Sequence, residues 1–425
     1  MLEVRRDRIQ FVENATREYG DFVAFRMGPK NLFLLRHPEH FRHVLADHSA
    51  KYVKGLGLAE ARAFLGEGLL TADGVVWQQY RKLLEASFQG GRLDSYSSQI
   101  HGVAKSWLAR VERMAHSGDV VVDVAHEMNL VTLRIVGLTQ FGWDFGDECA
   151  ATIAEDLHTL NDWAMRRMMS LVPLPLWMNP AAFQALGRLR TIALEILARV
   201  QKSDCNGIGS ALASEPGGPE AARDQVLTFL LAGHETTARA LAWAVGLLGG
   251  EDAGPVERLR AEAGRLGHVP ALAELQQLEY TRMVFEETLR LYPSVWLLPR
   301  KAIAADCIDG FEIPKGADVL LSVYSLHRHP KYWVDPDSFL PERFAKDRAA
   351  NRPAGCYLPF GLGKRACIGS RFGMLEGMML LAMFAQRLRW RRVDAGAMPA
   401  EGTLSLQPRG GLRIRIAPVG APMGA

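Results

Sequence analysis

A glycine-rich segment that ends in a cysteine and runs directly into a helical pattern constrains this chain more than any other feature. Residues 359–369 read Pro-Phe-Gly-Leu-Gly-Lys-Arg-Ala-Cys-Ile-Gly, and the apolar residues that follow repeat with a helical period. The pattern therefore places Cys367 at a helix N-terminus, where unpaired N–H groups and the helix dipole favour a thiolate. Arg365 adds positive charge nearby. Cys367 is thus a candidate nucleophile, metal ligand or redox thiol.

Two less specific interpretations of this segment stay open. A free cysteine is most often a small buried hydrophobic residue. The Gly361-x-Gly363 pair could belong to a dinucleotide-binding loop, but no clear strand precedes it and no βαβ unit surrounds it. The glycines permit close backbone approach that a Cβ would block, which favours a ligand-binding role for Cys367.

Residues 360–369 match every fixed position of Phe-Gly-x-Gly-x-Arg-x-Cys-x-Gly, and the segment thereby resembles the haem-binding loop of the cytochrome P450 haem-thiolate monooxygenases of the soluble bacterial type. The resemblance implies haem b with Cys367 as axial iron ligand and Arg365 as partner of a haem propionate. It implies a mainly α fold with a minor β part, a triangular prism of helices that encloses haem between a long central helix and the cysteine loop. Three further residues would belong to the cofactor site: Phe360, Gly361 and Gly369.

A second motif, Ala-Gly-His-Glu-Thr-Thr at residues 232–237, lies in a helical pattern from about 223 to 249. Apolar residues flank it on all sides, so its carboxylate must be paired, protonated or functional if it is buried. Gly233 costs about 1 kcal/mol relative to alanine within a helix, which indicates close packing or a ligand above it. Glu235 and Thr236 can relay protons; a polar strip on a solvent-exposed face is the alternative. The resemblance implies that Gly233 opens a groove for O₂ and that Thr236 and Glu235 guide protons to it.

Two pairs of residues at helical spacing complete the motif set. Glu287 and Arg290 share one helix face, and an ordinary surface pair of this kind contributes about 0–1 kcal/mol. The resemblance instead implies a buried structural triad completed by Arg343. Trp77 and Arg81 also share a helix face. The resemblance implies that they hydrogen-bond haem propionates, as does one more residue: Arg300. A core tryptophan and solvated arginines are the simpler interpretation.

The expected substrate pocket is mostly apolar, which predicts a sizeable hydrophobic substrate, although such residues are often plain core. By family position its residues are Leu58, Phe64, Met169, Phe229, Ala232, Val295, Trp296, Leu297 and Leu406.

The remaining pattern predicts a single domain over residues 1–425. Its helical part covers about 74–291 and 367–388, and its β-rich part about 20–40, 294–325 and 404–417. The connection over 203–222 is short, which predicts an abbreviated or partly mobile link into the central helix. Expected strands are Phe22–Met27, Leu32–Leu35, Val319–Val323 and Leu412–Ile416.

Composition excludes several classes of protein. The net charge of +3 argues against a strongly basic nucleic-acid binder. Five widely spaced cysteines argue against a disulfide framework and a structural zinc site, and fit a reducing cytoplasm. The N-terminus lacks the apolar region of a signal peptide, and charged residues interrupt the most apolar stretch, so no membrane span is expected. We expect a cytoplasmic protein.

The resemblance implies an O₂-dependent monooxygenase that hydroxylates or epoxidises a hydrophobic small molecule, with terpenoid and polyketide secondary metabolites as candidates. Electrons would come from ferredoxin and ferredoxin reductase or a similar donor, docked on positive charge near the thiolate side. Peroxide-driven or rearrangement chemistry in the same pocket, and a non-enzymatic haem-binding protein, are the alternatives. The intact Glu235–Thr236 pair argues for O₂ activation.

Overall fold

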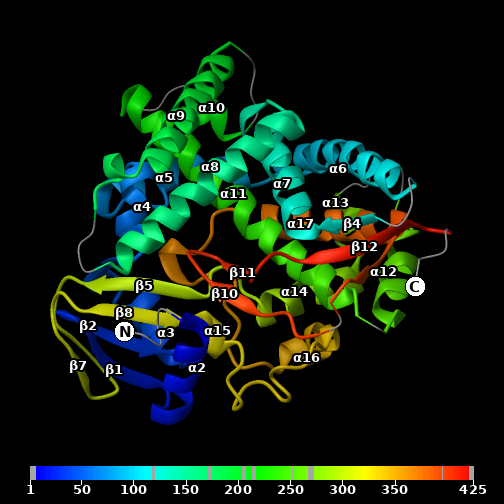
Figure 1. Cartoon of the computed structure of the whole chain (residues 1–425). Coiled ribbons are helices and arrows are strands. Elements are labelled where there is room, and N and C mark those ends of the chain that lie inside the picture. Colours follow the sequence, from blue (N-terminus) through cyan, green and yellow to red (C-terminus); the bar gives the residue numbers. More distant parts are fainter. Residues whose placement is uncertain are drawn as a thin grey trace.

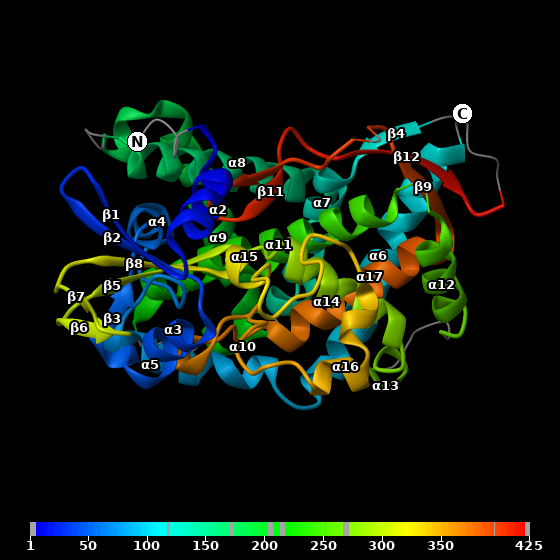
Figure 2. The ribbon, with the colours of Figure 1, turned by 90° about the horizontal axis from the view of Figure 1, so that it is seen from below.

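The computed structural model describes residues 6–116, 120–170, 174–202, 207–212, 217–250, 252–266, 272–394 and 396–420. Helices fill most of the molecule, and a twisted sheet with the N-terminal helix lies on one side of them (Figures 1 and 2). This arrangement is the mainly α fold with a minor β part that the sequence predicts. The cysteine loop lies between these two parts of the molecule.

The α-helices follow the apolar periodicity of the sequence. They are α2 Arg8–Tyr19, α3 Pro38–Arg42, α4 Leu58–Leu65, α5 Gly74–Glu85, α6 Arg92–His116, α7 Val124–Phe141, α8 Gly146–Met168, α9 Pro180–Val200, α10 Ile208–Leu212, α11 Gly218–Leu248, α12 Gly254–Ala263, α13 Leu272–Leu275, α14 Glu279–Leu291, α15 Val323–Leu326, α16 Lys346–Ala350 and α17 Ser370–Arg387. Short 3₁₀ or π turns lie at His43–Asp47 (η1), Ser49–Lys51 (η2), Ala86–Phe88 (η3), Leu176–Met178 (η4), Pro341–Phe344 (η5) and Gly363–Arg365 (η6).

Helix α11 crosses the centre of the molecule, where it packs against α7, α9, α14 and α17. It is buried on nearly all sides, as its apolar composition predicts. It begins at Gly218, about five residues before the predicted start, because Pro219 occupies its first turn. A proline has no backbone N–H, but the N–H groups of the first helical turn have no partner within the helix, so the proline costs no hydrogen bond there. The connection before α11 includes residues 203–206 and 213–216, which lie outside the described residues. The expectation that this connection is partly mobile falls on those residues as well.

The larger sheet has the strand order β1-β2-β8-β5-β3 within the described chain. Strands β1 and β2 form the predicted hairpin, and Gly28 takes the left-handed φ of +61° that its tight turn requires. Strand β2 then pairs in parallel with β8, so segments almost 300 residues apart share one apolar core with Phe33, Leu35 and Leu321. The strands are β1 Phe22–Met27, β2 Lys30–Leu35, β3 Tyr52–Lys54, β5 Leu297–Ala302 and β8 Asp318–Ser322.

Among the described residues, one of the smaller sheets joins distant segments, and the other two are the local hairpins β6–β7 and β10–β11. The order β4-β12-β9 brings the C-terminal strand between two strands that the sequence analysis did not predict. These strands are short, and their pairing with β12 stabilises them. The bounds are β4 Val120–Asp123, β6 Asp306–Ile308, β7 Phe311–Ile313, β9 Leu388–Arg392, β10 Ala400–Gly402, β11 Leu406–Pro408 and β12 Arg413–Pro418.

Candidate active site

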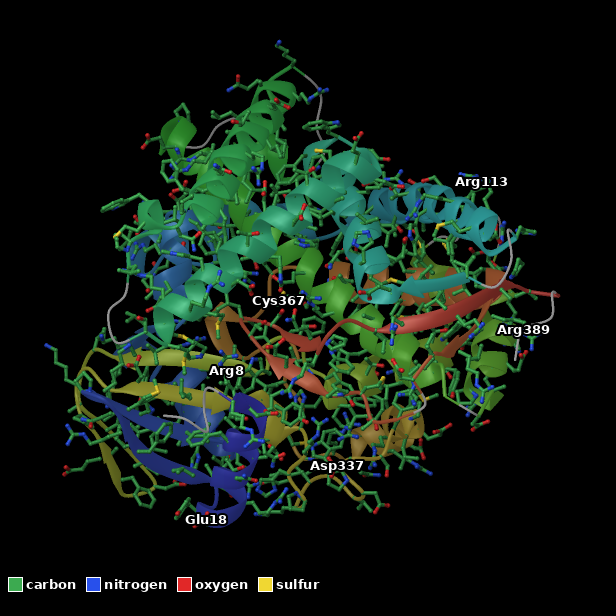
Figure 3. The ribbon with its side chains drawn as sticks, in the orientation of Figure 1. Arg8, Glu18, Arg113, Asp337, Cys367 and Arg389 are labelled. Atoms are coloured by element: carbon green, nitrogen blue, oxygen red, sulfur yellow. The ribbon has the colours of Figure 1, made fainter. Side chains whose placement is uncertain are left out.

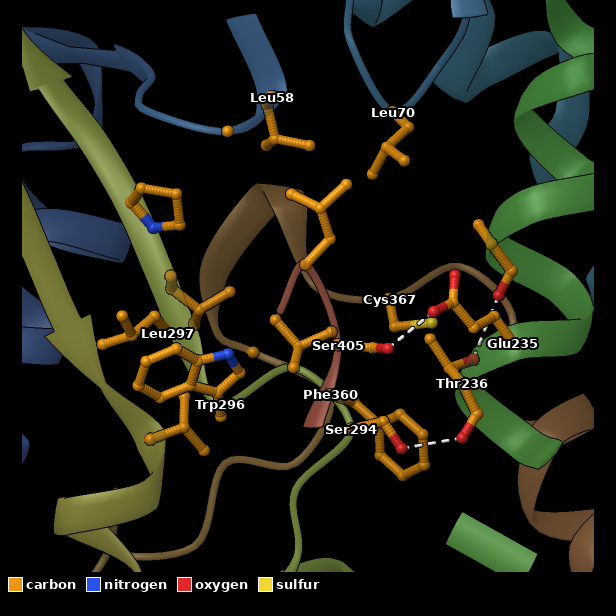
Figure 4. A pocket seen from close by; sticks show the side chains of 18 of the residues that line it. Leu58, Leu70, Glu235, Thr236, Ser294, Trp296, Leu297, Phe360, Cys367 and Ser405 are labelled. Atoms are coloured by element: carbon orange, nitrogen blue, oxygen red, sulfur yellow. Dashed lines mark hydrogen bonds between the residues drawn. The ribbon is translucent and has the colours of Figure 1, made fainter. Parts of the chain in front are cut away.

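A cavity of about 510 Å³ lies between α11 and the cysteine loop. Cys367 reaches it from the loop, and Glu235 and Thr236 reach it from α11 (Figure 4). Most of the remaining wall is apolar and comes from α2, α4, α8, β1, β2 and β5. The motifs that the sequence analysis singled out therefore meet at one site.

The cysteine loop is held by its own backbone. The Cys367 N–H donates to the Phe360 carbonyl at 2.8 Å, and the Gly361 N–H donates to the Leu358 carbonyl at 3.1 Å. Gly361 and Gly363 both take left-handed φ values, +74° and +73°. A Cβ at Gly363 would lie 2.2 Å from a backbone carbonyl oxygen of η1, so glycine is required there.

The Cys367 thiol is accessible from the cavity but has protein around it on the other sides. Burial raises its pKa, and the Gly369 backbone N–H and the Arg81 charge only partly oppose this rise. Helix α17 begins three residues after the cysteine, at Ser370. In the chain without a ligand, burial thus outweighs the helix N-terminus and the nearby positive charge that the sequence analysis expects to favour a thiolate. A bound metal would have to stabilise the anion.

A cluster of positive charge lies beside the loop and lines the same cavity. Lys54, Arg300 and Arg365 face one carboxylate, that of Asp73, which lies 2.6 Å from Arg365. Burial and the neighbouring arginines lower the pKa of Lys54 to about 7, and burial lowers that of Arg300 to about 10. The Nη1 atom of Arg365 is buried without a hydrogen-bond partner in the described structure. The cluster therefore carries more positive charge than the described chain balances, which suits an anionic ligand.

Trp77 and Arg81 lie at the same cavity. The Arg365 guanidinium is 5.0 Å from the Trp77 ring centroid, close enough for a cation–π contact. Arg81 donates at 2.7 Å to the carbonyl of Ala366, directly before the cysteine. The structure thus places Arg81 as a support of the loop, whereas Lys54, which the sequence analysis missed, lies within the cationic cluster. Lys54 lies in no sequence motif that could have identified it.

Cys367, the glycines and the unbalanced cations together fit a planar metal porphyrin that carries two carboxylates. The thiol would supply the axial ligand, and the cationic cluster would pair with the carboxylates. No strand precedes Gly361 within residues 324–360, so the dinucleotide-loop interpretation finds no support.

Glu235 is almost buried and its carboxylate is held by three elements. It accepts a hydrogen bond from Ser405 Oγ at 2.6 Å (Figure 4). It also accepts one from Asn161 Nδ2 at 3.0 Å and lies 3.8 Å from Arg239. Thr236 donates its hydroxyl to the Ala232 carbonyl at 3.0 Å. The adjacent acid and alcohol therefore lie at the cavity in fixed orientations. Neither Ser405 nor Asn161 stands in a motif, so only the folded chain identifies them.

A second cavity, of about 490 Å³ and mostly polar, adjoins the first. Glu235 lines both cavities, and the neighbouring His234 faces the polar one. Burial lowers the pKa of His234 to about 4, so this imidazole is neutral near pH 7. Other lining residues include Asp123, His126, His158, Asp162, Arg239 and Glu401. Glu235 therefore lies where the apolar cavity meets the polar cavity.

Gly233 also lines the first cavity. A Cβ at this position would lie 3.1 Å from a methyl group of Val136 on α7. Gly233 therefore meets both conditions that the sequence suggested, close packing against α7 and a cavity above the glycine.

The structure places most of the expected pocket residues at the cavity and corrects two of them. Phe64 is buried in the helical core instead, because it lies on the inward face of α4. Leu406 packs under the β10–β11 hairpin against Trp296. Ser405, one residue before Leu406, lies at the wall together with Thr403 and Leu404, because all three belong to the bend that joins β10 to β11, whereas Leu406 begins β11. The expected residues that do line the cavity are Leu58, Met169, Phe229, Ala232, Val295, Trp296 and Leu297.

Glu287 and Arg290 form a fully buried pair, joined by two hydrogen bonds of 2.7 and 2.8 Å. Arg343 adds a third contact to Glu287 at 3.2 Å. Arg290 also donates to the carbonyls of His327, Pro336 and Ser338. The pair therefore pins the irregular segment that leads to the cysteine loop, and is not a surface ion pair.

Comparison with known proteins agrees with this site. The family model described as Cytochrome P450 matches residues 1–413. Cyclooctatin synthase of Streptomyces melanosporofaciens is 34% identical, over 98% of this chain and 91% of that protein. Cyclooctat-9-en-7-ol 5-monooxygenase of the same organism is 32% identical, over 88% of this chain and 83% of that protein. Carotene epsilon-monooxygenase of Arabidopsis thaliana is 28% identical, over 94% of this chain and 80% of that protein. None of the described helices is long and apolar enough to span a bilayer.

Proposed function

The chain belongs to the cytochrome P450 family and is a haem-thiolate monooxygenase, and from this we propose that it hydroxylates or epoxidises a terpenoid. The cofactor in this proposal is haem b. The observation that carries the proposal is the meeting of Cys367, the cationic cluster and the Glu235–Thr236 pair at one apolar cavity.

The residues of the cysteine loop hold the cofactor in this proposal. Haem with a thiolate ligand supplies the reductive activation of O₂, since the anionic sulfur favours O–O cleavage. Cys367 would provide that sulfur, and Arg365, Arg300 and Lys54 would neutralise the propionates of the haem. Trp77 packs against Arg365 and limits its movement.

The proton supply rests on α11. Glu235 exchanges protons with the polar cavity and passes them toward Thr236, whose hydroxyl can both accept and donate. Asn161 and Ser405 hold the carboxylate where it meets both cavities. The apolar wall keeps bulk water away from the reacting carbon, which limits loss of electrons to side reactions.

Relatives and cavity chemistry both support a terpenoid substrate. Two of the similar proteins are named for cyclooctatin or its precursor alcohol, and a third for carotene. The cavity wall is mainly Leu, Met, Phe and Val, which suits a hydrocarbon skeleton.

Electrons come from a separate acidic donor such as ferredoxin with its reductase in this proposal. Lys82, Lys364 and Arg371 are exposed on the elements that surround the cysteine loop. Exposed positive charge steers an acidic partner to that face and speeds association at low ionic strength.

Two measurements on the haem-loaded protein test the proposal. Reduction under carbon monoxide should give the red-shifted Soret absorbance of thiolate coordination, and Cys367→Ser should abolish it. Incubation of terpenoid candidates with ferredoxin, its reductase and ¹⁸O₂ should place one labelled oxygen atom in the product. A wild-type protein without the shifted absorbance, or turnover without label from O₂, would contradict the proposal.

A further inference from the structure

The cavity extends away from Cys367 to a region where α2 and the β1–β2 hairpin form its wall. Arg8, the first residue of α2, lines this region, and Figure 3 labels both residues. The other residues of α2, β1 and β2 that line the cavity are apolar: Phe11, Val12, Phe25, Met27, Leu32 and Leu34. A guanidinium is thus placed in the hydrocarbon part of the substrate chamber.

The hydrogen-bonding capacity of Arg8 is largely unused among the described residues. Its Nη1 donates to the carbonyl of Gly402 at 2.8 Å, and its Nε is buried without a partner. Burial lowers the pKa of Arg8, which shows that water only partly solvates the charge. A guanidinium has five N–H donors, and most of them remain available to a bound molecule.

The carboxylates of Glu401 and Asp7 oppose the lowering of the Arg8 pKa through their charge, but neither forms a salt bridge with Arg8. Asp7 pairs with Arg409 at 2.7 Å and also accepts the N–H of Gln10. Glu401 accepts a hydrogen bond from Gln407 at 3.2 Å. No described carboxylate lies within 4 Å of the Arg8 guanidinium. A partly buried cation whose one described bond is to a neutral carbonyl favours an acceptor oxygen from a ligand.

We infer that Arg8 is a specificity-determining residue that binds an oxygen atom already present on the substrate. The inference rests on the proposed function and deepens it. The substrate is an oxygenated terpenoid, whose hydroxyl or carboxylate contacts Arg8 while the hydrocarbon end extends toward Cys367. A plain hydrocarbon offers Arg8 no acceptor, and leaves it unpaired when it displaces water from the chamber.

This inference gives the enzyme a place in a reaction sequence. A hydration, an earlier oxygenation or the hydrolysis of a prenyl diphosphate must supply the substrate, because a terpene hydrocarbon carries no acceptor. The enzyme would then add a second oxygen at a carbon remote from the first. The oxygen at Arg8 decides which end of the skeleton reaches the site of oxidation.

Optical titration of the haem-loaded protein tests the inference without turnover. Substrate binding displaces iron-bound water and shifts the Soret absorbance, which gives a dissociation constant. The probes share one isoprenoid skeleton: phytane, its alcohol phytanol and its acid phytanic acid. We expect the alcohol or the acid to bind about tenfold or more tightly than the hydrocarbon. Comparison of the dissociation constants of the alcohol and the acid shows whether Arg8 binds a neutral hydroxyl or an anionic carboxylate more tightly.

Arg8→Met removes the donors at similar length and should abolish the preference: affinity for the alcohol and the acid falls, and phytane binds more tightly because no guanidinium is left without an acceptor. Arg17→Ala, an exposed arginine of the same helix outside the cavity, is the matched control and should retain the preference. If Arg8→Met does not fold, Arg8→Gln can still donate to Gly402 and should lose the preference for the acid.

Equal affinity of the wild-type protein for all three probes would overturn the inference. So would a preference that persists in Arg8→Met, or an equal loss of affinity for all three probes, which a purely structural role predicts. Each titration uses protein that shows the red-shifted Soret absorbance after reduction under carbon monoxide. A failure of the haem-thiolate assignment is therefore detected before any probe is added.

Discussion

The hydroxyl of Ser405 donates a hydrogen bond of 2.6 Å to the carboxylate of Glu235, although 170 residues separate them. The bond ties the loop between β10 and β11 to the centre of α11, at the point where the apolar and polar cavities meet. Asn161 of α8 holds the other carboxylate oxygen. The orientation of the acid is therefore set by three separate parts of the chain.

Ser405→Ala should weaken proton delivery without loss of haem. We expect product per electron pair to fall about threefold to tenfold, with more hydrogen peroxide released, because Glu235 gains rotational freedom. The solvent deuterium isotope effect on turnover should rise. The exposed Ser98→Ala is the control. An unchanged isotope effect together with full coupling would show that this bond does not serve proton transfer.

Thr236→Ala should separate O₂-driven from peroxide-driven chemistry. O₂-driven product formation should fall about tenfold or more, while peroxide-driven turnover survives, since peroxide already carries its protons. The measurement compares product yields with both oxidants in one preparation. Equal loss in both assays would point to a structural role for Thr236, and no loss in either would remove it from the proton path.

Arg290→Ala should cost about 3–5 kcal/mol in the free energy of unfolding, because Glu287 is left buried without its main partner. Haem content should fall as well, since three carbonyls of the segment that leads to the cysteine loop lose a donor. Arg413→Ala breaks a pair whose side chains are 61% and 74% exposed, and should cost about 0–1 kcal/mol. Urea denaturation compares the two variants, and similar costs would contradict a special role for the buried pair.

Gly363→Ala should lower haem retention far more than Gly90→Ala. Both glycines take left-handed φ values, +73° and +62°, so both substitutions cost about 1–2 kcal/mol in backbone strain. Only at Gly363 would the new Cβ also meet a backbone carbonyl, at 2.2 Å, whereas nothing lies within 4 Å at Gly90. Haem content of the purified variants is the measurement, and equal retention would show that the loop can move to admit a side chain.

Lys54 should make the haem-free protein more stable as pH rises above about 7. Its pKa is about 7 in the folded chain and near 10.5 when unfolded, so the unfolded state binds more protons between these values. The free energy of unfolding therefore gains from Lys54 as pH rises from about 7 toward 10. Lys54→Met should remove this dependence and the exposed Lys105→Met should not. Identical pH profiles for wild type and Lys54→Met would contradict the lowered pKa.

The sequence determined those features that depend on residues close together in the chain. The glycines and Cys367 fix a loop geometry by local backbone sterics, and the spacing of Glu287 and Arg290 fixes their meeting on one helix face. The apolar flanks of Glu235 indicated its burial. Each of these inferences needs only neighbouring residues and the geometry of a helix or turn.

The tertiary structure decided which distant side chains complete the site. Arg8, Lys54 and Ser405 reach the cavity from α2, β3 and the loop before β11, while Phe64 is directed into the core. Periodicity identifies an apolar face but not the surface that covers it, because that depends on how helices and sheets pack against one another. The charge balance around Arg300 and Arg365 depends on the same packing, so only the folded chain shows that positive charge exceeds the single carboxylate of Asp73 there.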